Sequence, residues 1–95
     1  MNTFFITELL NVTLMGVDPP TGWLQDHNAF ETKQECEALI PEITPIIYQQ
    51  YMMYTHGLGT IDAIECMTEE DWIERNVELG HQRPERVGNK RKDTN

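Results

Sequence analysis

Two cysteines and three histidines are the residues of this sequence best suited to chemistry. Cys36 stands in "FETKQECEALI" and Cys66 in "IECMTEEDWI", and each directly follows a glutamate. The N-terminus of a helix lowers the pKa of a nearby thiol, but the neighbouring acids Glu35 and Glu37 act in the opposite direction. A thiol-dependent enzyme built on either cysteine is therefore the least favoured of our hypotheses, and we expect a protein that is not an enzyme.

The two cysteines could also be linked to each other or packed as small apolar residues. A disulfide between Cys36 and Cys66 would close a loop of about 31 residues, which stabilises a fold by roughly 3–4 kcal/mol on the chain-entropy model. A chain in a reducing compartment keeps its thiols free, and a free cysteine packs as a small hydrophobe. We favour core packing, with the disulfide and the reactive thiol as alternatives.

No spacing in the sequence is typical of a metal or cofactor site. The side chains that could bind zinc lack the short paired spacings of structural zinc sites; they are His27, Cys36, His56, Cys66 and His81. The acids of "TEEDW" lack the spacing and the glycine of a calcium loop. Neither a glycine-rich phosphate loop nor a nucleophile elbow is present. We expect no cofactor, no metal and no catalytic residue.

Charge is distributed unevenly along the chain, which has 16 acids, 7 bases and a net charge of −9. Residues 1–80 hold 14 acids against Lys33 and Arg75, a net charge of −12, whereas residues 81–95 hold five bases and two acids. An acidic surface repels nucleic acid and accelerates association with basic proteins in a salt-dependent way. We therefore expect a protein partner with a basic surface and no direct binding of nucleic acid, although solubility alone would also explain the charge.

The apolar stretch "MNTFFITELLNVTLMGV" has the features of neither a secretory leader nor a membrane span. Glu8 and Asn11 interrupt it, no basic residue precedes it, and a spanning helix would need about 20 apolar residues in a row. We expect a cytoplasmic chain that does not enter a membrane.

β-Branched and aromatic residues from Thr3 to Val17 favour a strand there. The competing interpretation of residues 3–15 is a helix, because apolar residues also recur at helical spacing. "WLQDH" follows the turn sequence "DPPTG", so residues 12–27 are predicted to form a hairpin with a five-residue loop.

A long helix is predicted to begin at Thr32. Thr32-Lys33-Gln34-Glu35 has the form of a capping box, in which the Thr32 hydroxyl accepts from the Glu35 amide and the Glu35 carboxylate accepts from the Thr32 amide. Pro41 and Pro45 each remove a backbone donor, so the helix must kink or restart, with Thr44 as the new cap. Gly57 supplies a left-handed end.

A third strand and a second helix are predicted after Gly59. Strict alternation in "TIDAIECM" places Ile61, Ala63 and Glu65 on one face and Ile64 and Cys66 on the other. Thr68 is predicted to cap the helix "EEDWIERNVEL", whose first acids complement the helix dipole.

These elements predict an α+β fold: a small antiparallel sheet, made of a β-hairpin and a third strand, with a kinked helix on one face and a short C-terminal helix. Residues 1–78 are predicted to form a single domain. Residues 79–95 are polar and unpatterned, which predicts a disordered, mildly basic tail.

The second half of the long helix is rich in tyrosine and methionine. One face, with Ile43, Ile47, Tyr51 and Tyr54, is predicted to pack on the sheet. The candidate residues for an oligomer interface lie outside this face: Ile46, Tyr48, Met52 and Met53. A symmetric homodimer is the simplest form of such an interface; the alternative is that the sheet and the last helix cover both sides.

In "TGWLQDHNAFETKQECEALI" and "IECMTEEDWI" the chain resembles small proteins of unknown function from phages and their bacterial hosts. The shared features are a hairpin with a Trp, a Phe-x-Thr-x-x-Glu-Cys helix start and a second Cys before a Trp, over roughly residues 12–77. The resemblance implies a fold and a viral origin, with the host cytoplasm as the location, and it implies no activity.

We therefore expect a non-catalytic acidic protein-binding module, of the kind that a phage would use to modulate or inhibit a host protein that handles nucleic acid. The candidate partner-binding residues are Asp26, Glu31, Glu69, Glu70, Asp71 and Glu74. The alternative is a homo-oligomeric structural or accessory protein that assembles through the Tyr/Met-rich helix.

Overall fold

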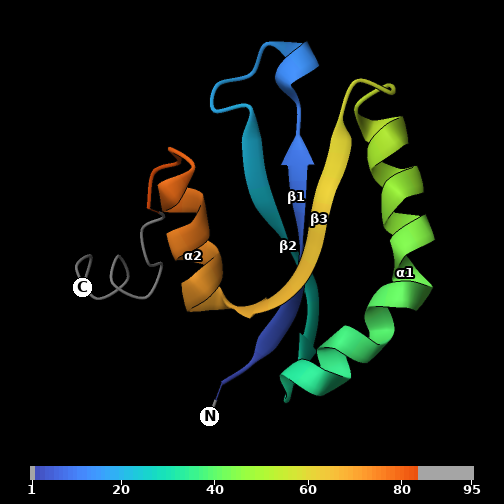
Figure 1. Ribbon diagram of the computed structural model, residues 1–95, viewed down its shortest axis with the longest axis vertical. Helices are drawn as coiled ribbons and strands as arrows, with labels where there is room; N and C mark the ends of the chain where they lie inside the picture. The colour runs from blue at the N-terminus through green and yellow to red at the C-terminus, as the bar shows by residue number, and fades with distance from the viewer. Residues whose placement is uncertain (1, 84–95) are drawn as a thin grey trace, which may run out of the picture.

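The computed structural model describes residues 2–83, which form a three-stranded antiparallel sheet with one long and one short helix (Figure 1). The elements follow in the order β1 (Phe4–Asn11), the 3-10 helix η1 (Thr13–Met15), β2 (Thr21–Phe30), α1 (Lys33–Tyr54), β3 (Thr60–Thr68) and α2 (Glu69–Glu78). The strand order β2-β1-β3 places β1 in the centre. The predicted small α+β fold is confirmed.

The hairpin is longer than predicted and turns at another place. β1 pairs with β2 from Phe4 and Phe30 to Asn11 and Thr21, which confirms a strand rather than a helix in this segment. The predicted hairpin of residues 12–27 is wrong, because residues 12–20 are the connection between the strands. The Asn11 side chain explains why β1 ends at this residue. Its Oδ1 accepts from the Thr13 amide at 2.9 Å and from the Thr13 hydroxyl at 2.6 Å, and these bonds turn the chain out of the strand.

α1 is one continuous helix through both prolines. The Thr32 hydroxyl accepts from the Glu35 amide at 3.1 Å, which is one of the two bonds of the predicted capping box. The ribbon bends between the two halves of the helix, so the predicted kink is confirmed (Figure 1). The alternative of a restart at Thr44 is wrong: the Thr44 hydroxyl donates back to the Ile40 carbonyl at 2.7 Å, a bond that bends a helix without ending it.

After α1 the chain turns through Gly57, as predicted. Gly57 has a φ of 80° and its amide donates to the Met52 carbonyl at 2.8 Å. The buried Thr55 hydroxyl accepts from the Gly59 amide at 2.9 Å, which sets the direction in which β3 begins.

An irregularity in β3 changes which of its side chains face α1. The pairing with β1 shifts between Leu9, opposite Ala63, and Leu10, opposite Ile61, so Asp62 is an extra residue in β3. Ile61 therefore belongs to the same core as Cys66. The predicted grouping of Ile61 with Ala63 and Glu65 is wrong, because it assumed unbroken alternation.

The main core lies between α1 and the sheet. Its buried residues are Ile6, Cys36, Ile47, Ile61 and Cys66, and its partly buried neighbours are Phe4, Leu10, Phe30, Leu39, Ile40, Ile43, Tyr51 and Ile64. The hairpin, the helix and the third strand all contribute, so the sheet and α1 stabilise each other.

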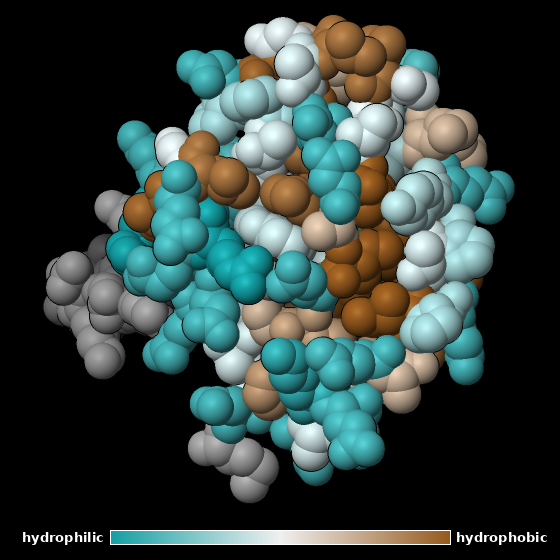
Figure 2. Space-filling view, in the orientation of Figure 1, coloured by the Kyte–Doolittle hydropathy of each residue, from teal (hydrophilic) through white to brown (hydrophobic). Residues whose placement is uncertain are grey.

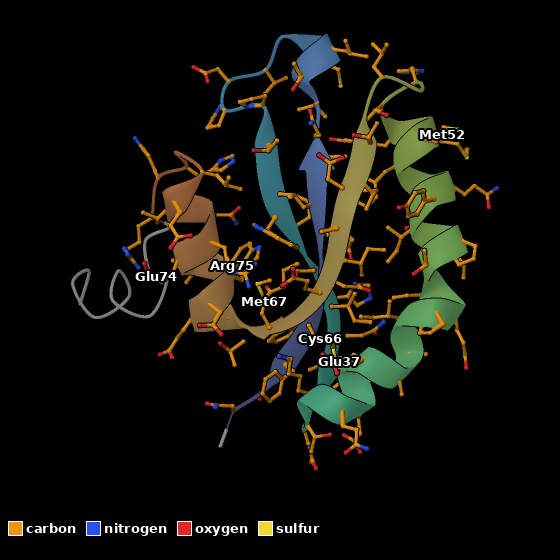
Figure 3. The ribbon with its side chains drawn as sticks, viewed as in Figure 1. Glu37, Met52, Cys66, Met67, Glu74 and Arg75 are labelled. Atoms are coloured by element: carbon orange, nitrogen blue, oxygen red, sulfur yellow. A yellow bond between two sulfur atoms is a disulfide. The ribbon has the colours of Figure 1, made fainter. Side chains whose placement is uncertain are left out.

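Cys36 and Cys66 are joined by a disulfide inside this core, with their Cα atoms 6.1 Å apart. The first turn of α1 packs over the end of β3, which brings the two sulfurs together; Figure 3 shows Cys66 beside the start of α1. The preference for free, packed thiols is wrong, although both residues are buried as expected. Neither sulfur is then available as a reactive thiolate.

α2 lies beside β2 and closes its outer edge (Figure 1). Asn76 pairs with both backbone groups of Trp23: its Oδ1 accepts from the Trp23 amide at 2.7 Å, and its Nδ2 donates to the Trp23 carbonyl at 3.0 Å. The Trp72 Nε1 donates to the same carbonyl at 2.6 Å. These backbone groups would otherwise be open to another strand. The predicted cap is confirmed, since the Thr68 hydroxyl accepts from the Asp71 amide at 3.2 Å.

Residues 79–83 continue from α2 along β2. The His81 Nε2 lies 2.7 Å from the Thr21 carbonyl oxygen. Gly22 permits this approach, because a Cβ at that position would lie 2.8 Å from the same nitrogen. The first residues of the predicted tail thus lie against the sheet, and residues 84–95 are outside the described part of the chain. Neither helix in residues 2–83 combines the length and the apolar character that a membrane crossing requires.

Candidate functional site

Glu8 is a carboxylate buried in the middle of the sheet. It stands on the central strand between Ile6 and Leu10, both of which belong to the core under α1. Only 3% of the Glu8 surface is exposed. Its Oε1 accepts from the Tyr51 hydroxyl at 3.4 Å, and its Oε2 has no hydrogen-bond partner in residues 2–83. A buried acceptor without a donor is unfavourable, so this position is unusual for a residue that only packs.

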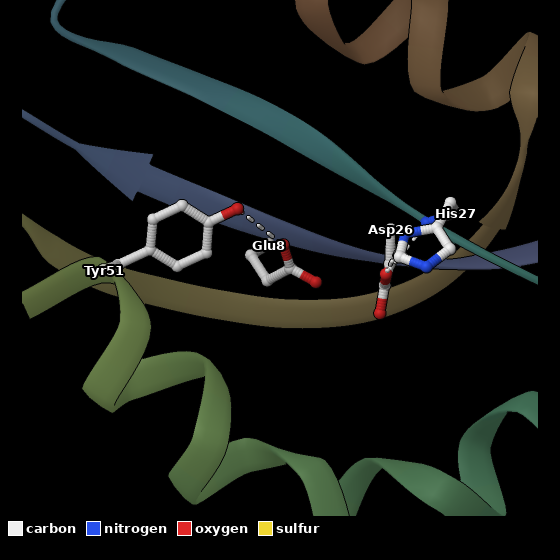
Figure 4. A network of polar contacts seen from close by, with 4 residues as sticks. All are labelled: Glu8, Asp26, His27 and Tyr51. Atoms are coloured by element: carbon white, nitrogen blue, oxygen red, sulfur yellow. Dashed lines mark hydrogen bonds and ion pairs between the residues drawn. The ribbon is translucent and has the colours of Figure 1, made fainter. Parts of the chain in front are cut away.

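Glu8 lines a cleft of about 240 Å³ formed by β1, β2 and α1. The other residues that line it are Gln25, Asp26, His27, Ile47, Gln50 and Tyr51. Figure 4 shows Tyr51 on one side of Glu8 and Asp26 with His27 on the other. The cleft therefore combines two carboxylates, a phenol and two amides.

A bulge in β2 brings Asp26 to this cleft. The pairing of β1 with β2 shifts between Phe5, opposite Ala29, and Thr7, opposite Gln25, so residues 26–28 stand opposite Ile6 alone. The Asp26 Oδ1 accepts from the His27 amide at 2.8 Å, which holds the carboxylate in place. The His27 ring lies 3.4 Å from the same oxygen, but its side chain is 94% exposed, whereas that of Asp26 is 22% exposed.

The surroundings of Glu8 favour its protonated form. Burial and, to a smaller extent, the negative charge of Asp26 raise the pKa of Glu8 from 4.5 to about 7, against the opposing effect of the Tyr51 hydrogen bond. Burial and then the Glu8 charge raise the pKa of Tyr51 to about 12. Near neutral pH Glu8 is therefore present in both forms, and a positive charge in the cleft would favour the carboxylate.

The predicted partner-binding acids do not form one surface. Asp26 lies in the cleft with Glu8, and Glu31 is exposed in the short connection that follows β2. The remaining four are exposed on α2, namely Glu69, Glu70, Asp71 and Glu74. Figure 2 shows a mainly hydrophilic surface over α2. Glu74 forms an ion pair with Arg83, in which the Glu74 Oε2 lies 2.7 Å from the Arg83 Nη2. The structure thus brings together the α2 acids and separates them from Asp26.

The four predicted oligomer-interface residues are exposed on α1: Ile46 by 54%, Tyr48 by 47%, Met52 by 60% and Met53 by 69%. Tyr54, which was predicted to pack on the sheet, is 76% exposed, so that prediction is wrong. Tyr54 is the last residue of α1 and contacts the edge of the Tyr51 ring, at 6.5 Å between centroids, instead of the sheet.

Sequence reasoning missed two features. The first is the buried carboxylate of Glu8. Glu8 is the only charged residue between Thr3 and Val17, and a single acid inside an apolar strand could have indicated a special site. The second is the apolar connection between β1 and β2, where Leu14, Met15 and Val17 are exposed. Figure 2 shows apolar surface gathered at that end of the molecule. It was missed because residues 12–17 were assigned to a strand.

A scan against protein-family models and searches of curated proteins and solved structures gave no significant match to this chain. The resemblance to phage and bacterial proteins therefore stays a prediction. What the chain does has to be inferred from its own geometry and charge.

Proposed function

We propose that this chain is a non-catalytic protein-binding module whose partner presents a basic surface. The observation that carries the proposal is the charge of residues 2–83, which hold 14 acids against Lys33, Arg75 and Arg83. Among these residues only Glu65 and Glu74 have an arginine within ion-pair distance. An excess of exposed carboxylates attracts a positively charged protein over a long range and orients it before contact.

The acids of α2 are the best candidates for direct contact. Glu69, Glu70, Asp71 and Glu74 lie within about one and a half helical turns, and all four are exposed. A protein that handles nucleic acid carries a groove of Lys and Arg side chains for phosphate groups. Such a groove is the partner surface that fits this helix, and the chain would then compete with nucleic acid for it.

The experiment is capture of the partner from bacterial lysate followed by affinity measurement with the purified partner. We expect the affinity to fall by about tenfold or more between about 0.05 M and 0.5 M salt, because screening shortens the range of the attraction. The double variant Glu70→Gln/Glu74→Gln should weaken binding, and the matched control Glu37→Gln/Glu42→Gln, with the same charge change on α1, should have less effect. Salt-independent binding would count against the proposal, as would equal effects of the two double variants.

A second candidate function, assembly of identical copies, has its own supporting observation. Residues 43–61 contain no Asp, Glu, Lys or Arg, and this stretch exposes the four residues of the predicted interface. Two copies that each carry a charge of −9 repel each other, and a charge-free surface is where they meet with the least repulsion.

Light scattering over a range of concentrations tests this second candidate. If copies assemble through α1, Met52→Ser/Met53→Ser should abolish the assembly. The control Leu14→Ser/Met15→Ser, which removes similar apolar area from the β1–β2 connection, should leave it intact. A strict monomer at the highest concentration would exclude the candidate.

A further inference from the structure

We propose that the cleft between Glu8 and Asp26 binds a primary ammonium group, and that the group is a lysine side chain of the basic partner. The inference rests on the proposed function for the identity of the partner. The binding of the ammonium group itself rests on the geometry of the cleft alone.

Two buried polar atoms of residues that line the cleft have no hydrogen-bond partner in residues 2–83, the acceptor Glu8 Oε2 and the donor Gln25 Nε2. The Glu8 side chain is almost fully buried, lines the cleft, and leaves Oε2 without a hydrogen-bond partner in residues 2–83. Asp26 adds a second carboxylate, and neither Lys nor Arg is among the residues that line the cleft. A group that carries positive charge would donate a hydrogen bond to the Glu8 Oε2 and be attracted by the charge of Asp26.

An ammonium group fits better than the other cations. Within residues 2–83 no three His, Cys, Asp or Glu side chains are grouped as a metal site requires. A guanidinium binds best to both oxygens of one carboxylate, but the Glu8 Oε1 already accepts from Tyr51. The single unpartnered oxygen suits a compact ammonium, while Ile47 and the Tyr51 ring supply apolar walls for the methylene groups of a lysine.

Binding is coupled to a proton. Where Glu8 carries a proton, the entering ammonium displaces it: the Glu8 O–H bond breaks, the proton goes to solvent, and the carboxylate accepts from N–H. The other ionisable groups at the cleft are Asp26 and His27 from β2 and Tyr51 from α1, and the adjacent β3 residue is the uncharged Ile64. With the pKa of Glu8 at about 7, affinity should rise roughly tenfold from pH 6 to pH 8.

The test is an NMR titration of the full chain with two probes, n-butylammonium chloride and Nα-acetyl-lysine methylamide, with n-pentanol as the uncharged comparator. We expect both amines to give saturable shifts at the amides of Glu8, Gln25, Asp26 and Gln50, and pentanol to give none. Glu8→Gln keeps the size of the side chain and should lower the affinity for both amines by at least about tenfold, which is the loss expected for a charge-assisted hydrogen bond. Asp26→Asn should lower the affinity for both amines by a smaller factor, and the exposed control Glu37→Gln should leave it unchanged.

Three results would overturn the inference: amine binding by Glu8→Gln equal to that of the parent, equal shifts from pentanol, or an affinity that does not rise with pH. Binding of butylammonium without binding of the lysine derivative would overturn the assignment to lysine. If Glu8→Gln abolishes amine binding but leaves the affinity for the purified partner unchanged, the lysine is not the partner's, and the proposed function stands. If amines bind through Glu8 but no basic partner exists, the proposed function fails and the ammonium site remains.

Discussion

The two sides of the sheet are held to their helices in different ways. α1 is attached by an apolar core and a disulfide, and this side also contains Glu8, a buried carboxylate with an unpartnered oxygen. α2 is attached by polar bonds from Asn76 and Trp72 to the backbone of the β2 edge and by its buried apolar residue Ile73. The unfavourable group thus lies on the side that has a covalent bond to offset it, and a group kept at such a cost is a candidate for function.

The largest effect should come from removing the disulfide. Cys36→Ala/Cys66→Ala releases a link across a sequence separation of 30, which should lower the free energy of unfolding by about 3–4 kcal/mol on the chain-entropy model. Urea unfolding with and without reductant measures this, and reductant should reproduce the effect in the parent and have none on the variant. A loss below about 1 kcal/mol would show that the apolar core alone holds α1. The disulfide would then not distinguish the attachment of α1 from that of α2.

The next effect concerns Glu8 and depends on pH. The folded-state pKa of about 7 lies above the ordinary value of 4.5, so the folded chain binds more protons than the unfolded chain between these values. Stability should therefore be highest below about pH 4.5, as far as Glu8 contributes, and fall as pH rises to 7 and beyond, by on the order of 3 kcal/mol.

Glu8→Gln should remove this loss. The variant should be more stable than the parent at pH 8 and close to it at pH 5, as measured by urea unfolding at both values. The control Asp71→Asn removes an exposed acid and should not show the same pH dependence. A parent whose stability rises between pH 5 and pH 8 by the same amount as that of Glu8→Gln would contradict the burial of an unsatisfied carboxylate.

A smaller effect is expected on the α2 side. Asn76→Ala leaves the amide and the carbonyl of Trp23 without their side-chain partner, and Trp72 still serves the carbonyl, so the loss should be about 2 kcal/mol. Hydrogen exchange at the Trp23 amide should quicken, whereas exchange in α1 should not. The exposed control Asn28→Ala on the same strand should change stability by less than about 0.5 kcal/mol. Equal protection of Trp23 in parent and variant would mean that α2 does not close this edge.

The smallest effects separate the two helix starts. Thr32→Ala and Thr68→Ala each remove a side-chain acceptor at an N-cap, which should lower stability by about 1 kcal/mol. Because the disulfide at Cys36 holds the first turn of α1, only Thr68→Ala should produce local fraying, seen as faster exchange in the first turn of α2. Thr32→Ser and Thr68→Ser, which keep the hydroxyl, are the matched controls. Fraying of both helices to the same extent would remove the distinction drawn between them.

Sequence reasoning succeeded where the signal was local. The caps at Thr32 and Thr68 and the left-handed turn at Gly57 each depend on groups within about five residues of one another. The bend in α1 follows from its two prolines, and the exposure of the Tyr/Met face follows from helical spacing. These features, with the order of the elements, were enough to predict the α+β fold.

Prediction from the sequence failed where the position of a side chain depends on pairing with a strand that is distant in the chain. The extra residue at Asp62 and the bulge at residues 26–28 are defined only by pairing with β1, and they decide the faces of Ile61 and Asp26. Strict alternation, which is all that a single strand shows, predicts neither.

The sequence by itself thus determined the order of the elements, the starts of both helices and the strong negative charge, because propensity, capping and charge are properties of neighbouring residues. The tertiary structure alone decided that Cys36 meets Cys66, that Asn76 closes the edge at Trp23, and that Glu8 is buried beside Tyr51 and Asp26. Each of these contacts joins residues 18 or more positions apart. They form only when the sheet closes under α1 and beside α2, since burial and pairing depend on which surfaces the whole chain brings together.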